Sequence, residues 1–220
     1  GFITRATYLG PRDKRHGVRL TAAPWLWFLT LSQACRIFQD QTARDIVEAI
    51  FSDRGFGDYE FRISGNSPTY PYCVQYNETD FNFVSRLMQK EGWYYFFEHD
   101  NGSHKMIIVN SMTEHEPYPG YDVFTYEDAV GVGADEGERV HGWRPQRRVR
   151  PTGVALQSYD HVKPGADIRG ESAIAREHAL SEHEIYEYSG VYREQSEGDA
   201  YAKTRVEALQ ATHALARAHA

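Results

Sequence analysis

The chain has 220 residues, of which 41% are hydrophobic and 25% are charged, and its formal net charge at pH 7 is −7. This length and composition are typical of one or two globular domains with a sizeable core. The negative charge argues against a nucleic-acid-binding protein, which normally carries a basic stripe. No window resembles a signal peptide, and the apolar run 25–31 is too short to span a membrane, so no stable membrane anchor is expected.

The chain contains two cysteines, Cys35 and Cys73, and they form neither a C-x-x-C pair nor a disulfide framework. Cys73 lies in an apolar strand pattern, which predicts a buried and reduced thiol. That state is typical of a protein that folds in a reducing compartment. The sequence starts with Gly and ends in a run of Ala, His and Arg, so we expect it to be part of a longer chain.

The first elements in chain order are two strands. Apolar and polar residues alternate over residues 2–9 and again over 18–22, and the turn-rich stretch 10–17 between them predicts a hairpin. The apolar run 25–29 fits either a short buried helix or a strand, because periodicity does not discriminate between them in so short a run. Residues 36–39 are predicted to be extended.

Two helices follow, each with local start and stop signals. The first runs from its N-cap Thr42 to Arg54, and the second runs from its N-cap Thr79 to Glu91. The Asp100–Ser103 turn predicts a hairpin between the last two strands of this region. The strands predicted around the helices cover residues 59–63, 72–76, 93–98 and 105–109. Residues 64–71 are predicted to form a loop.

The composition of the sequence changes after residue 110. An acidic, Pro-rich stretch at 114–121 predicts a linker, and a Gly-rich stretch at 130–137 predicts a loop. The later strands are predicted at 122–126, 140–149, 154–160 and 186–192. The later helices are predicted at 173–180 and 198–213. Four arginines lie at positions 144, 147, 148 and 150; they favour a solvated edge strand, with anion or partner binding as the alternative.

This order of elements lacks βαβ alternation and has no internal repeat. It predicts an α+β fold that is mainly β, in which an α+β insertion separates two β-elements.

The side chains that commonly carry chemistry do not form a recognisable catalytic set. The histidine–acid clusters at 114–116, 177–178 and 182–184 lack the H-E-x-x-H pattern, so neither a metal site nor a cofactor is predicted. Glu91 and Glu98 flank an aromatic strand, but their spacing alone does not place them across a cleft. Ser85 lies in a predicted helix without a nucleophile elbow. The sequence therefore predicts that the chain is not an enzyme.

The remaining signal is a run of five aromatic residues. Both faces of the predicted strand are aromatic, so both need to be covered. One interpretation is a central strand enclosed within its own domain. The other is that one face meets another subunit, where Trp and Tyr are enriched. The candidate interface residues are Trp93, Tyr94, Tyr95, Phe96 and Phe97.

Several motifs resemble those of the VgrG (Rhs/Vgr) family of type VI secretion spike proteins. The segment that carries most of the resemblance runs from Tyr72 to Phe97 and includes the stretches 72–76, 78–81, 86–87, 91–92 and 95–97. The stretches 1–5, 24–27 and 32–39 are similar to the same family. These motifs are in order within residues 1–97, and the resemblance as a whole covers nearly the whole chain.

The resemblance implies a region similar to the hub of contractile phage tail baseplates, with β-barrel elements and an inserted α+β domain. By that pattern, residues 1–24 are the end of a truncated first hub barrel, 25–114 the inserted domain and 115–220 part of the second barrel. Members of the family form homotrimers that sit on hexameric Hcp rings and continue into an OB barrel and a needle with a PAAR tip. This sequence departs from the pattern because it lacks most of the first barrel, which is expected to expose a strand edge, as well as the OB barrel and the needle.

The function implied is structural: a hub that joins the Hcp tube to the needle of a puncturing spike and helps deliver effectors into target cells. The resemblance also implies assembly in the bacterial cytoplasm and secretion through the type VI apparatus. Two alternatives remain. One is a binding module that recruits effectors through the aromatic strand or residues 130–137. The other is a fragment of a spike with a peptidoglycan-hydrolase or toxin domain elsewhere in the chain.

Overall fold

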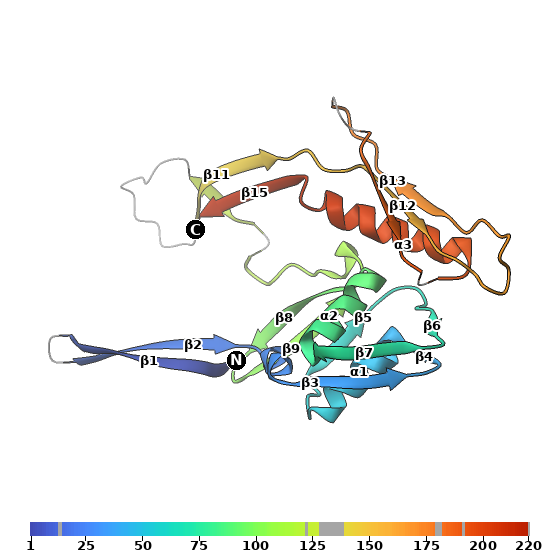
Figure 1. Cartoon of the computed structure of the whole chain (residues 1–220). Helices are drawn as coiled ribbons and strands as arrows, with labels where there is room; N and C mark the ends of the chain where they lie inside the picture. The colour runs from blue at the N-terminus through green and yellow to red at the C-terminus, as the bar shows by residue number, and fades with distance from the viewer. Residues whose placement is uncertain (13–14, 122, 128–138, 179–181, 191, 220) are drawn as a thin grey trace. The chain divides into compact units, whose positions relative to one another are not determined.

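The computed structural model describes residues 1–12, 15–121, 123–127, 139–178, 182–190 and 192–219 (Figure 1). The chain divides into two compact units, residues 1–114 (unit 1) and residues 115–220 (unit 2). The described strands form sheets of two or three strands, with helices packed against some of them, and none of these sheets closes into a barrel. No described helix has both the length and the apolar character needed to cross a bilayer. The prediction of a mainly β fold with some helices is confirmed.

Unit 1 begins with an antiparallel ribbon of strands β1 (Phe2–Arg12) and β2 (Arg15–Ala23), which projects from the rest of the unit (Figure 1). This confirms the predicted hairpin. The 3₁₀ helix η1 (Trp25–Leu31) follows it and decides between the two interpretations of that apolar run. The helical form brings Trp25, Leu26 and Leu29 into the core, where all three side chains are buried.

Helices α1 (Ala43–Asp53) and α2 (Asp80–Glu91) confirm both predicted helices of unit 1. Thr42 caps α1 through a reciprocal pair of hydrogen bonds, in which its hydroxyl accepts from the Asp45 N–H at 3.2 Å and its own N–H donates to the Asp45 carboxylate at 2.9 Å. Gly92 ends α2 in the left-handed conformation with φ of 73°, which glycine adopts without steric cost.

Three small sheets surround these helices. In the largest, β9 (Ser103–Val109) lies between β5 (Tyr59–Arg62) and β8 (Tyr94–Asp100), parallel to the first and antiparallel to the second. The other two sheets each contain two strands: β3 (Gln33–Phe38) with β7 (Cys73–Thr79), and β4 (Gln41–Thr42) with β6 (Thr69–Tyr70). The predicted loop at 64–71 is therefore wrong at its end, because Thr69 and Tyr70 pair with β4. A short 3₁₀ helix, η2 (Met112–Glu114), closes the unit.

One hydrophobic core holds unit 1 together, and it combines η1, both helices and the central strand β9. Its largest fully buried side chains include Trp25, Phe51 and Phe83. The Trp25 ring packs edge-on against Phe51 at a centroid distance of 4.9 Å and stacks on Phe56 at 4.8 Å. The apolar stripe of α1 faces this core: its residues at 46, 47, 50 and 51 have no exposed surface.

Unit 2 is built around β12 (Gly153–Gln157), which pairs with β13 (Gly170–Ala173) on one side and with β14 (Glu184–Tyr188) on the other. Helix α3 (Gln195–Gln210) packs on this sheet and buries Ala202 and Val206. The predicted helix at 173–180 is wrong: Ala173 ends β13, residues 174–178 are not helical, and 179–180 lie outside the described residues. Strand pairing with β12 overrides the helical preference of the alanines there.

The other sheet of unit 2 contains β10 (Thr125–Glu127), β11 (Arg139–Arg147) and β15 (Ala214–His219). Residues 214–219, for which the sequence predicted no element, form a strand along β11. The strand β11 lies in the middle of this sheet, so the edge-strand interpretation is wrong for the strand as a whole. Arg144 and Arg147 lie on the part of β11 that pairs, among the described residues, with β15 alone. The predicted loop at 130–137 lies outside the described residues.

Candidate functional site

The aromatic run occupies an edge of its sheet rather than the centre. Trp93 precedes β8, and Tyr94 to Phe97 lie on it, while β9 is the central strand. The interpretation of residues 93–97 as a central strand is therefore wrong. The buried side chains of β9, Met106 to Val109, supply the two-sided burial that was expected of β8.

One side of β8 belongs to the core of unit 1. Trp93 is only 6% exposed, and its ring meets Phe61 edge-on at a centroid distance of 5.7 Å. Tyr95 and Phe97 are half-buried against the same core, with their rings 5.9 Å apart. Burial raises the pKa of the Tyr95 hydroxyl above its ordinary value. These three aromatic residues therefore serve mainly to stabilise the fold.

The alternate residues of β8, Tyr94 and Phe96, lie on the opposite face of the strand. Tyr94 is 37% exposed, and its hydroxyl donates to the Met112 sulfur at 3.4 Å. Phe96 is half-buried. Of the five candidate interface residues, the structure thus brings only these two together on a face outside the core.

The two carboxylates beside the aromatic run make structural contacts. Glu91 accepts a hydrogen bond from the Tyr70 hydroxyl. Glu98 forms an ion pair with Arg62 at 2.9 Å, and Arg62 also binds Glu60 at 2.8 Å. The two glutamates raise the pKa of Arg62, and hydrogen bonding by Arg62 lowers the pKa of Glu60. This arrangement holds β5 against the β8–β9 hairpin.

A buried charge cluster in unit 1 was not expected from the sequence. The Asp80 carboxylate has no exposed surface and accepts from Arg54 at 2.7 Å and from the Gln75 amide at 2.8 Å, with Arg36 3.7 Å away. Asp80 is the first residue of α2 and lies near the positive end of the helix. No local signal reveals the cluster, because its partners lie on β3, on β7 and after α1.

The two cysteines differ in their surroundings. Cys73 is half-buried rather than fully buried as predicted, and burial raises the pKa of its thiol. Cys35 is exposed, and its sulfur accepts from the Asn77 N–H at 3.3 Å.

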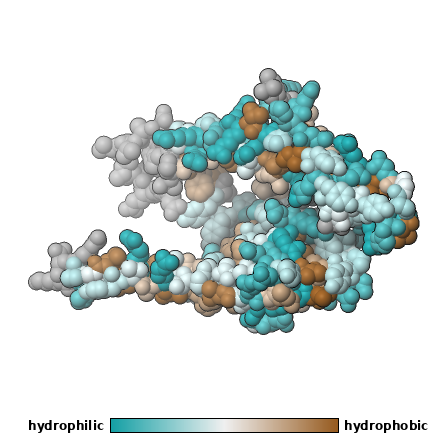
Figure 2. Space-filling model, in the orientation of Figure 1, coloured by the Kyte–Doolittle hydropathy of each residue, from teal (hydrophilic) through white to brown (hydrophobic). Residues whose placement is uncertain are grey.

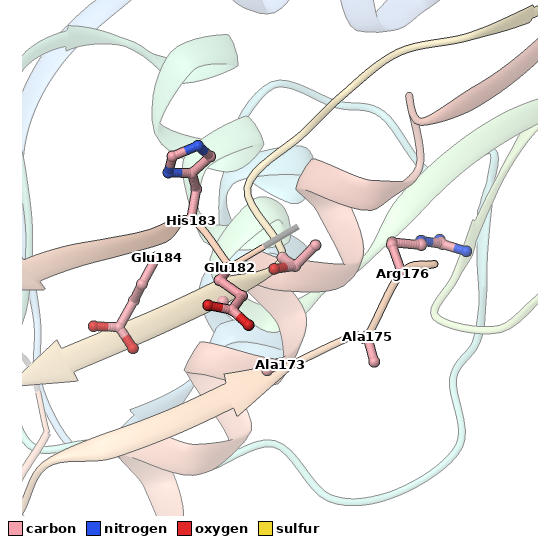
Figure 3. Close-up of a pocket in the computed structure, with 8 residues that line it drawn as sticks. Ala173, Ala175, Arg176, Glu182, His183 and Glu184 are labelled. Atoms are coloured by element: carbon pink, nitrogen blue, oxygen red, sulfur yellow. The ribbon is translucent and has the colours of Figure 1, made fainter. Parts of the chain in front are cut away.

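A pocket of about 430 Å³ lies in unit 2 beside the start of β14 (Figure 3). Its lining residues are Thr152, Gly153, Ala173, Ala175, Arg176, Glu182, His183 and Glu184. Figure 3 shows the His183 ring on the opposite side of the chain from the Glu182 and Glu184 carboxylates. Arg176 donates to Gln210 at 2.8 Å, and Arg169 lies 3.5 Å from Glu184. The described residues contain no group of three or more side chains placed to hold a metal ion.

The β1–β2 ribbon exposes an apolar face. The cross-strand pairs Ile3–Ala22, Ala6–Leu20 and Tyr8–Val18 lie on this face, while Arg5, Thr7, Arg19 and Thr21 lie on the other. The side chains of Ile3, Tyr8, Val18 and Leu20 are each more than half exposed, and Figure 2 shows hydrophobic residues along the projecting ribbon. Such alternation is typical of a sheet whose apolar face is covered by another layer. No described residue covers the apolar face of this ribbon.

Comparison with known proteins identifies a family and several relatives that this chain resembles. The sequence model of the phage tail baseplate hub (GPD) family matches residues 1–220. The type VI secretion system spike protein VgrG1b of Pseudomonas aeruginosa is 39% identical over 199 residues, which are 90% of this chain and 27% of that protein. The chain thus spans about a quarter to a third of the length of the curated spike proteins it matches.

Two solved structures share the fold. The tail protein from Neisseria meningitidis MC58 matches 96% of this chain and 60% of its own, with a TM-score of 0.67 and 12% identity. The Escherichia coli c3393 protein, described as a type VI secretion component similar to the T4 bacteriophage tail proteins gp27 and gp5, matches 68% of this chain and 39% of its own, with a TM-score of 0.56 and 24% identity.

Proposed function

The chain belongs to the phage tail baseplate hub family and is a relative of VgrG spike proteins, and from this premise we propose that it is the hub region of a type VI secretion spike. The observation that carries the proposal is the match of the hub family along all 220 residues, together with the identity to VgrG1b. Puncturing a target cell and delivering effectors are then activities of the longer protein to which this region contributes. In this proposal the spike assembles in the bacterial cytoplasm and leaves through the type VI apparatus.

We assign three parts to this region. Residues 1–24 are the end of a first hub barrel, residues 25–114 the inserted α+β domain, and residues 115–220 part of a second hub barrel. The exposed apolar face of the β1–β2 ribbon supports the first assignment, because a two-stranded ribbon with one apolar face needs a further layer to be stable. The division of the chain at Glu114 supports the limit between the second and third parts.

The hub acts as a homotrimer in this proposal. Two related barrels in each of three subunits present six similar surfaces, which suits the six-fold symmetry of an Hcp ring. The apolar face of the ribbon is the surface of unit 1 that we assign to such assembly. The PAAR tip and effectors are partners of the longer protein.

The role of the region is mechanical rather than catalytic. The carboxylates that flank the aromatic strand are engaged with Tyr70 and Arg62, and Cys73 is half-buried with a raised pKa. The Tyr70–Glu91 contact fastens β6 to the end of α2, and the Arg62–Glu98 contact fastens β5 to β8, which suits a part that transmits force.

A graft tests the proposal directly. Residues 1–220 replace the matched region of the P. aeruginosa VgrG1b spike, and release of the tube protein into the medium is measured beside a strain that lacks the spike. We expect the graft to restore release. Failure of a stably accumulated graft to support release would contradict the hub function.

Paired variants of the graft test the ribbon. Val18→Asp with Leu20→Asp places charges on the apolar face and is expected to abolish release. Arg19→Asp with Thr21→Asp makes the same number of changes on the polar face of the same strand and is expected to preserve it. Equal loss in both variants, at equal protein levels, would exclude a specific role for the apolar face.

A further inference from the structure

A basic ribbon stands out in unit 2 of this acidic protein. Residues 139–150 contain five arginines and no Asp or Glu, and residues 211–220 contain Arg217 and again no acid, although the whole chain carries a net charge of −7. These two stretches are far apart in the sequence. The structure joins them, because β11 and β15 pair as an antiparallel ribbon (Figure 1).

The pairing register gathers three arginines on one face of this ribbon. Arg144 lies directly opposite Arg217, and Gln146 lies opposite Leu215. One step further along, the Arg148 N–H donates to the His213 carbonyl at 2.8 Å, and the Arg148 guanidinium donates to the Gln146 side chain at 3.3 Å. The last contact shows that Arg148 and Gln146 share a face. We call Arg144, Arg148 and Arg217, with Gln146 and Leu215 between them, the arginine face.

No described carboxylate forms an ion pair that balances the positive charges of the arginine face. All five of its residues are exposed, and none of its arginines forms an ion pair with a described carboxylate. Elsewhere in unit 2 basic residues do have such partners: Arg169 pairs with Glu171, Arg205 with Glu187, and Lys163 with Glu194 at 3.3 Å. Like charges directly opposite each other destabilise a strand pair, so the Arg144–Arg217 pair disfavours the ribbon unless an anionic group lies against it.

We propose that the arginine face is a docking surface for a carboxylate-rich protein surface. Planar guanidinium groups bind carboxylates with two parallel hydrogen bonds, and Arg is enriched at the energetic centres of protein interfaces. Leu215 adds an apolar contact in the middle of the face, as protein interfaces have and phosphate-binding tracks do not need. This surface goes beyond the proposed hub function and does not depend on it.

Binding of model anions tests the proposal. The 220-residue chain is titrated into two ligands in separate experiments: a fluorescein-labelled decaglutamate peptide and an oligothymidylate of equal charge. A third titration repeats the peptide experiment with inorganic phosphate as a competitor. We expect saturable binding of the peptide that weakens with salt and is tighter than binding of the oligonucleotide. Tighter binding of the oligonucleotide, complete competition by millimolar phosphate, or no saturable binding of the peptide would each overturn the proposal.

Two double variants locate the surface. Arg144→Glu with Arg217→Glu keeps a like-charge pair across the strands but reverses its sign, and we expect it to weaken peptide binding about tenfold or more. Arg5→Glu with Arg19→Glu makes the same change in net charge on the polar face of the β1–β2 ribbon and is expected to leave binding nearly unchanged. Equal weakening by the two variants would show a general charge effect and overturn the assignment.

A single variant separates docking from folding. Arg217→Glu alone turns the repulsive Arg144–Arg217 pair into an attractive one, so the melting temperature is expected to rise while peptide binding falls. A variant that lost binding only because the ribbon came apart would instead melt at a lower temperature. Unchanged binding by Arg217→Glu would contradict a role for this face.

Discussion

Gly170 on β13 and Gly198 on α3 are in direct backbone contact: a Cβ atom on Gly170 would lie 2.1 Å from the carbonyl carbon of Gly198. The Tyr192 ring closes the other side, only 2.6 Å from where a Cβ of Gly198 would be. Helix α3 therefore lies on its sheet at a distance that only two glycines allow. The Tyr192 hydroxyl fastens this contact by donating to the Leu156 carbonyl at 2.7 Å.

Gly170→Ala is expected to destabilise unit 2 by about 1–3 kcal/mol or more, because α3 has to move away from β13 to admit the methyl group. Urea denaturation followed by circular dichroism measures the change. The matched control is Gly165→Ala, where no atom lies within 4 Å of the added carbon, and it is expected to change stability by less than about 0.5 kcal/mol. Similar effects of the two substitutions would refute the close contact.

Asp80→Asn is expected to cost about 3–5 kcal/mol, because it removes the buried charge that balances Arg54 and leaves Arg36 with only the exposed Asp53 carboxylate as an ion-pair partner. The measurement is the free energy of unfolding of unit 1. Asp53→Asn is the control: this carboxylate also faces Arg36, at 3.5 Å, but it is exposed, and its removal is expected to cost no more than about 1 kcal/mol. A loss at Asp80 as small as that at Asp53 would contradict the buried cluster.

His104 is expected to make stability depend on pH. Its Nε2 accepts from the Trp25 N–H at 3.0 Å, and the ring packs against Phe2 and His99. Burial lowers its pKa below the ordinary value of 6.5, with the N-terminus and His99 acting in the same direction and Asp58 against it. The unfolded chain therefore takes up the proton first, so the contribution of His104 is present above about pH 6.5 and is lost as the pH falls towards the folded pKa.

Unfolding free energies at several pH values between neutral and mildly acidic check this expectation. His104→Gln keeps a side chain that can accept from the Trp25 N–H but cannot titrate, so its stability is expected to fall less on acidification than that of the wild type. His161→Gln, at an exposed position, is expected to retain the wild-type dependence. The same pH dependence in all three proteins would exclude His104 as the group responsible.

Thr42→Ala is expected to destabilise unit 1 by about 1 kcal/mol, because it removes the hydroxyl that accepts from the Asp45 N–H at the start of α1. Thr42→Ser retains the hydroxyl and is expected to stay close to the wild type. Thermal melting of the three proteins ranks them. An alanine variant as stable as the serine variant would show that the cap contributes nothing.

Local chemistry made much of unit 1 predictable. Thr42 with Asp45, Thr79, Gly92 and the Asn101-Gly102 turn each act within a few residues, so their elements appear where the sequence predicts them. The prediction failed where a segment distant in the sequence determines the local structure. Ala173 lies in a strand because it pairs with β12, and residues 214–219 form a strand because they pair with β11.

The candidate site shows the same division. The aromatic composition of residues 93–97 predicted a strand with two sides to cover, but only the tertiary structure placed β8 at a sheet edge and left Tyr94 and Phe96 as its outer face. The cluster around Asp80 joins residues up to 44 positions apart (Arg36 to Asp80), and the arginine face joins residues 73 positions apart (Arg144 to Arg217). Caps, turns and periodicity are encoded in neighbouring residues, so the sequence by itself determined the helices, the hairpins and the family motifs. Strand order and charge partners depend on which segments meet in space, and only the folded chain decided those.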